Sequence, residues 1–113
     1  MRDATGDIII PSDCPPISGA AVLIEVRDVS RADALSTVVA QTRLTGVDFR
    51  PGDRIPFCLT IPEVSEAQSL DVRVHISCTG INDIRSGDLL TTRSHPVPSR
   101  GTLGHISVLV QRI

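Results

Sequence analysis

Apolar and polar residues alternate over short segments of this chain, and turn residues separate the segments. The clearest case runs from Asp71 to Thr79, where Val72, Val74, Ile76 and Cys78 alternate with polar residues. A period of two places successive side chains on opposite faces of a β-strand. This segment is therefore predicted to be a strand of an antiparallel sheet with one buried face and one exposed face.

Seven such segments follow one another, and no helical pattern long enough for a crossover connection separates them. They span residues 5–11, 20–29, 36–44, 54–61, 71–79, 89–97 and 104–113. Short turns can join neighbouring strands of this kind in antiparallel pairs. The pattern predicts an all-β protein, a single antiparallel β-sandwich of about seven strands, of immunoglobulin or prealbumin-like type. One domain is expected over residues 1–113, with residues 1–4 as a disordered tail.

Proline and glycine mark the turns and one edge of the predicted sandwich. Turns are expected at 30–35 and at 46–52. Pro56 lies within the strand predicted at 54–61, and Pro62 follows it directly. Neither proline has the backbone N–H that would pair with a neighbouring strand. This strand is therefore predicted to lie at a sheet edge, where a protein partner could bind by strand addition.

The composition agrees with a β protein and excludes several other classes. The 113 residues include 12 Val and 12 Ile against 9 Leu, and β-branched residues favour strands. There is no Trp, Tyr or Lys, and the net charge is -2. A nucleic-acid partner is not expected, because both a basic surface and a stacking platform are missing. No segment has the length and apolarity of a membrane span.

The cysteines leave two readings open. Cys14, Cys58 and Cys78 are odd in number, so a monomer keeps at least one free thiol. None belongs to a C-x-x-C pair, which argues against a zinc or redox motif. The three are either reduced thiols, or Cys14 forms a disulfide with a partner.

No pattern of catalytic or ligand-binding residues is visible, and an enzyme is not expected. Alternation directs His75 to solvent, and nothing favours a Cys58–His75 pair over two unrelated exposed residues. The aspartates near turns lack the spacing of a calcium loop, and no glycine-rich phosphate loop is present. We therefore predict no catalytic, cofactor-binding or metal-binding residue, and no cofactor.

A partner surface is the remaining candidate site. Arg27, Arg31 and Arg43 are expected around the second and third strands, either as a salt-bridged solvent face or as part of a protein-binding surface. The acidic residues expected among them are Glu25, Asp28 and Asp33. Leu23, Val39 and Leu109 have the outward parity of three strands. If those strands are neighbours, the three side chains form an apolar patch for a partner or a second copy. Otherwise they are single surface aliphatics.

Three blocks of the sequence resemble one known family. An aliphatic strand followed by the turn D-V-S-R-A-D-A occupies residues 21–34, and Pro-Gly followed by Ile-Pro-Phe occupies 51–57. The third block, G-D-L-L-T-T-R-S-H-P-V, occupies 87–97. Together they resemble the YbaY-like family, also described as YscW-type type III secretion lipoprotein chaperones, over most of the chain.

This resemblance implies a small β-sandwich associated with the bacterial cell envelope. The best-described members act as pilotins, lipoprotein chaperones that assist an outer-membrane secretin, and the family brings no catalytic residues. We therefore expect a non-enzymatic binding or chaperone-like protein that engages a protein partner or associates with itself. The alternatives are a structural homodimer and an enzyme of unrecognised type. The chain as given has no signal peptide or lipobox, so it is expected in the cytoplasm, or in the envelope if an upstream signal has been removed.

Overall fold

The computed structural model describes residues 2–30, 36–62, 69–80, 84–93, 95–97 and 105–113. Within these ranges every helix or strand assigned is a β-strand. The strands are β1 (Arg2–Ile9), β2 (Ile17–Asp28), β3 (Thr37–Phe49), β4 (Arg54–Ile61), β5 (Leu70–Ser77), β6 (Leu89–Leu90), β7 (Pro96–Val97), β8 (Ile106–Leu109) and β9 (Gln111–Arg112). Of the turn predicted at 30–35, residues 31–35 lie outside the described part.

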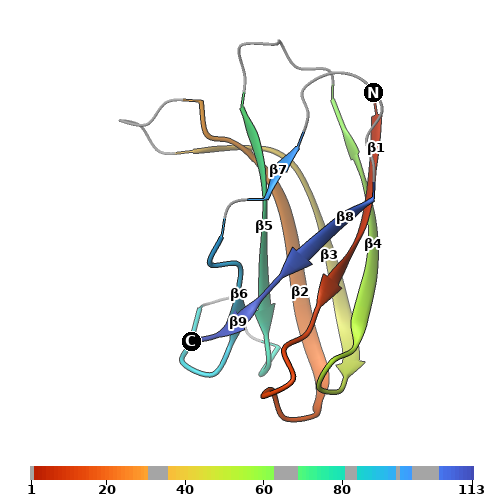
Figure 1. Cartoon of the computed structure of the whole chain (residues 1–113), viewed down its shortest axis with the longest axis vertical. Coiled ribbons are helices and arrows are strands. Elements are labelled where there is room, and N and C mark those ends of the chain that lie inside the picture. The colour runs from red at the N-terminus through yellow and green to blue at the C-terminus, as the bar shows by residue number, and fades with distance from the viewer. Residues whose placement is uncertain (1, 31–35, 63–68, 81–83, 94, 98–104) are drawn as a thin grey trace.

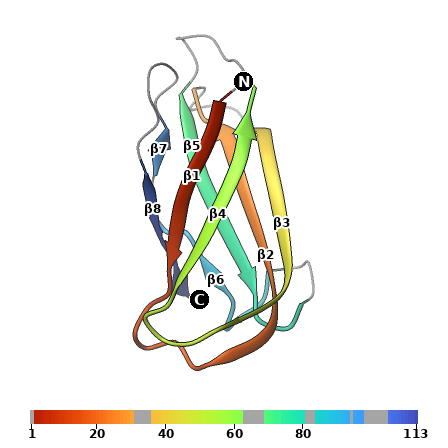
Figure 2. The same ribbon diagram turned by 90° about the vertical axis from the view of Figure 1, so that its right-hand side faces the viewer.

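The strands form two sheets that face each other, which confirms the predicted β-sandwich (Figures 1 and 2). One sheet has three strands in the order β4-β1-β8. The other has six strands, in the order β3-β2-β5-β6-β9 with β7 also paired to β5. Each of the last two predicted segments, 89–97 and 104–113, contains two short strands, so the described strands outnumber the segments.

One strand pair departs from the predicted antiparallel pattern. β1 and β8 are parallel, with Gly6 opposite Ile106 and Ile9 opposite Leu109. The other recorded pairs are antiparallel. After β8 the chain crosses at Val110 to the six-stranded sheet, where β9 pairs with β6 (Figure 1). The last segment therefore joins the two layers.

The core lies between the sheets and follows the alternation in the sequence. Every second residue of β4 is buried, and so is every second residue of the middle of β2. The side chains less than 2% exposed include these large aliphatic ones: Ile8, Ile10, Ile24, Ile61, Ile76 and Leu89. Burial of such side chains stabilises the fold by roughly 1.5–3 kcal/mol each, which makes this interface the main source of stability.

The predicted edge strand is confirmed among the described residues, since β4 is the outermost strand of the three-stranded sheet. Pro56 lies opposite Asp7 of β1. Strand addition at this edge stays a prediction.

Two local predictions are wrong. Residues 2–4 form the start of β1 rather than a tail, because Ala4 is completely buried and pairs with Leu59. The turn predicted at 46–52 is shorter, because β3 continues to Phe49. Gly46, with a φ of 63°, lies within β3 at a register irregularity against β2. A bulge of this kind uses the freedom of glycine at positive φ without ending the strand.

Candidate functional site

Four charged residues form a compact square on the outer face of the six-stranded sheet. Glu25 and Arg27 come from β2, and Asp71 and Arg73 come from β5. The register places Glu25 opposite Arg73 and Arg27 opposite Asp71, so opposite charges are neighbours across the strands. Such cross-strand pairs stabilise a sheet modestly.

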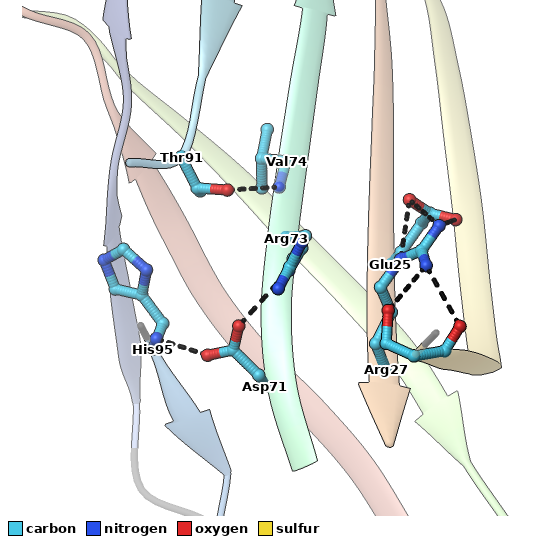
Figure 3. A network of polar contacts seen from close by, with 8 residues as sticks. Glu25, Arg27, Asp71, Arg73, Val74, Thr91 and His95 are labelled. Carbon is cyan, nitrogen blue, oxygen red and sulfur yellow. Dashed lines mark hydrogen bonds and ion pairs between the residues drawn. The ribbon is translucent and has the colours of Figure 1, made fainter. Parts of the chain in front are cut away.

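The recorded ion pairs in this square run along the strands (Figure 3). Arg27 Nη2 lies 3.3 Å from Glu25 Oε2, and its Nη1 donates to Ser36 Oγ at 2.8 Å. Arg73 Nε lies 3.5 Å from Asp71 Oδ2. The Arg27 guanidinium is therefore held by several hydrogen bonds, whereas the Arg73 side chain is 53% exposed and has the longer ion pair.

Asp71 is buried although its position in the alternation faces outward. Its carboxylate accepts a hydrogen bond from the backbone N–H of His95, next to β7 (Figure 3). On the same side, Thr91 is bound to Val74 twice: Thr91 N–H donates to Val74 O at 3.1 Å, and Val74 N–H donates to Thr91 Oγ1 at 3.3 Å. These bonds fix the segment after β6 against β5.

Two adjoining hollows lie over this part of the sheet, and we call them together the arginine groove. The first, of about 280 Å³, is lined by Glu25, Arg27, Arg73, Val74, His75, Ile84, Leu90 and Thr91. The second, of about 430 Å³, is lined by Val29, Asp71, Arg73, Thr91, Thr92 and Arg93. Arg73 and Thr91 belong to both hollows, so they form the boundary between the two.

A buried carboxylate supports one side of the groove. Asp88, 1% exposed, accepts hydrogen bonds from His75 Nε2 at 2.9 Å, Arg85 N–H at 3.0 Å and Cys78 N–H at 3.1 Å. Burial alone would raise the pKa of Asp88, but these three donors lower it by more, so the net shift is downward. The arrangement ties the segment before β6 to the end of β5.

The prediction that His75 points to solvent is wrong. Its side chain faces outward but is only 12% exposed, because the segment that carries Asp88 covers it. Cys58 lies in β4 of the other sheet and is exposed. The structure therefore does not bring Cys58 and His75 together as a nucleophile and base.

A second polar cluster lies on the outer face of the three-stranded sheet. Asp7 accepts from Arg54 Nη1 at 2.8 Å and from Ser107 Oγ at 3.0 Å, and His105 Nε2 is 3.2 Å from it. The Arg54 guanidinium, helped by Ser107 and His105, lowers the pKa of Asp7 against the opposing effect of burial. Ser107 donates to the carboxylate rather than to the imidazole, so this trio lacks the serine–base contact that activates a nucleophile.

The residues predicted as a partner surface are divided between several places. Arg27 lines the arginine groove, and Leu23 and Arg43 are opposite each other on β2 and β3. Arg31 and Asp33 lie outside the described residues. Val39 instead packs against the core, because a register irregularity between Val26 and Arg27 of β2 breaks the alternation of β3.

Leu109 is 41% exposed but lies on β8 of the three-stranded sheet. The three strands are thus not all neighbours, and Leu23, Val39 and Leu109 do not form one patch.

The sequence-based interpretation missed most of the groove. Asp71, Arg73, Thr91, Thr92 and Arg93 were not singled out. The alternation placed Asp71 and Arg73 on the same face as His75, which was the available signal. Their closeness to residues 91–93 depends on a contact between separate segments that no local pattern shows.

Cys14 is buried, Cys58 is exposed and Cys78 is half-buried, all as free thiols. Burial raises the pKa of the Cys14 and Cys78 thiols. The described residues contain no group of three or more His, Cys, Asp or Glu arranged to hold a metal ion. In the same part of the chain, no helix has the length and apolarity needed to cross a membrane.

No family model matches this chain, and no curated protein matches it. Among solved structures, the chain is similar to an alternative pilotin from the type II secretion system of Vibrio cholerae. The TM-score is 0.67 at 18% sequence identity, and the match covers 99% of this chain and 96% of the pilotin. The likeness shows that the two chains share a fold.

Proposed function

We propose that this protein is a non-enzymatic, chaperone-like binding protein of the pilotin type. The fold likeness to a pilotin over nearly the full length of both chains carries the proposal. The resemblance to YbaY-like and YscW-type proteins supports the same role. Its partner is then a protein, and the resemblance points to an outer-membrane secretin.

The arginine groove is the proposed binding site. It lies over β2 and β5, which pair along eight register positions and have a fully buried inner face. A groove on such a rigid base needs little ordering when a partner binds, and this lowers the entropic cost of association. The ion pair and hydrogen bonds of Arg27 orient one of its cationic groups in advance.

The proposal is tested with the secretin encoded by the same genome, purified in detergent and titrated with the purified chain. We expect saturable binding, and Arg73→Glu should weaken it about tenfold, because charge reversal at a groove centre repels a partner selected for the native charge. Arg50→Glu is the matched control, since Arg50 is exposed in the β3–β4 turn outside the groove. An absence of secretin binding by the folded wild-type chain would refute the pilotin role.

A further inference from the structure

The two hollows of the arginine groove differ in chemistry. The first has an apolar side, made by Leu90, which is half-buried, and Ile84, which is 60% exposed. Water hydrates such an exposed aliphatic side chain poorly, so its burial by an apolar group of a partner is favourable. The first hollow therefore suits an aliphatic side chain of a partner.

The second hollow is polar and has an excess of cationic groups. Arg73 lies on its boundary with an ion pair to Asp71, and Arg93 makes no ion pair or hydrogen bond with any described residue. Thr91 and Thr92 add hydroxyl groups to the lining. Among the described lining residues, three guanidinium groups face two carboxylates, so an anionic group of a ligand would balance the charge of these residues.

The hydrogen bonds of the lining also indicate which kind of anion fits. The backbone N–H of Val74 already donates to Thr91 Oγ1, and the backbone N–H of Thr91 already donates to Val74 O. Capture of a chain-terminal carboxylate commonly uses a nest of free backbone N–H groups. Here the available donors belong to side chains, above all Arg93, and these suit the side-chain carboxylate of an internal Asp or Glu.

We infer that the arginine groove binds a peptide segment in which an aliphatic residue enters the first hollow and an Asp or Glu side chain enters the second. This inference rests on the proposed function, because it gives the chemistry of the partner segment that the proposed site receives. The carboxylate contacts Arg93 and Arg73, and the aliphatic side chain contacts Ile84 and Leu90.

A library of random dodecapeptides, displayed on phage and selected on the purified full chain, tests the inference. We expect enrichment of sequences that combine Asp or Glu with Leu, Ile or Val. For the best synthetic peptide, replacing the acid by its amide should weaken binding about tenfold, and added salt should weaken the acidic peptide more than its amide. Selection without an acidic preference, or equal binding of acid and amide, would overturn it.

Variants locate the contact. Arg93→Gln should remove most of the difference in affinity between the acidic peptide and its amide, whereas Arg50→Gln should leave that difference unchanged. Circular dichroism and thermal unfolding establish that both variants fold. If Arg93→Gln folds and still distinguishes acid from amide as the wild type does, the assignment of the second hollow is wrong.

The same samples separate this inference from the proposed function. Secretin binding without an acidic preference among peptides would refute the inference and leave the pilotin role standing. Acidic selection that depends on Arg93, without secretin binding, would refute the pilotin role and leave the groove chemistry standing.

Discussion

Asp88 is the residue whose removal gives the sharpest test of how the groove is supported. Asp88→Ala deletes the acceptor of three hydrogen bonds, from His75, Cys78 and Arg85. Burying a polar group without its partner costs about 1–3 kcal/mol. In the variant, the backbone N–H of Arg85 can donate to water because Arg85 is exposed. The main loss of stability therefore comes from the unpaired donors of Cys78 and His75.

The expected loss in the free energy of unfolding is about 2–4 kcal/mol. For a domain of this size that corresponds to a fall in Tm of roughly 8–17 °C. Asp88→Asn should be intermediate. Its amide oxygen can keep the acceptor role toward His75 and Arg85, but its NH₂ group then faces the N–H of Cys78.

Urea unfolding followed by circular dichroism measures these differences, with Asp53→Ala as the matched control. The Asp53 carboxylate accepts one recorded hydrogen bond, from Arg50 N–H at 2.9 Å, in an exposed turn, and its removal should cost only about 0.5–1 kcal/mol. If Asp88→Ala is no more destabilising than Asp53→Ala, the segment before β6 is not held by this carboxylate and our account of the groove is wrong.

Two further predictions concern the three-stranded sheet. Gly6→Ala should destabilise the fold by about 3 kcal/mol, because the new Cβ would overlap the carbonyl oxygen of Ile106 and lie 2.8 Å from Phe57 Cζ. An unchanged urea midpoint would contradict the β1–β8 pairing. The second concerns pH: Arg54 and its neighbours lower the pKa of Asp7, so folding favours the ionised form. The resulting stability is fully present above the ordinary value of 3.8 and is lost as the pH falls through the lower folded-state value. Urea midpoints are measured between neutral and acidic pH. They should fall less steeply at the acidic end for Asp7→Asn than for the wild type. Parallel curves would show that ionised Asp7 adds no stability through its partners.

The predictions from sequence succeeded where a property belongs to a single strand. Alternation assigned Val72, Val74 and Ile76 to the buried face of β5, and all three are buried. Pro56 indicated an edge strand because a missing N–H is a property of the residue itself. The strand segments and the sandwich could be predicted for the same reason, since an excess of Val and Ile favours strands wherever they pair.

The candidate site could be predicted only in part. Arg27 was named as a surface residue and lines the groove, but Val39 was assigned to the wrong face, because a bulge depends on how β2 and β3 align. His75 was assigned to solvent because alternation says which side of a strand a residue occupies, not what lies on top of it.

Sequence alone determined that this chain forms short strands with one apolar and one polar face, and that the apolar faces must be buried against each other. Only the tertiary structure decided which strands became neighbours. Ser107 bonds to Asp7 across 100 positions of the chain, and the parallel pairing of β1 with β8 that allows it has no local signature. The groove arises in the same way, since residues 91–93 meet β5 through long-range packing. Such contacts are selected by the total burial of the folded chain, which no short stretch of sequence contains.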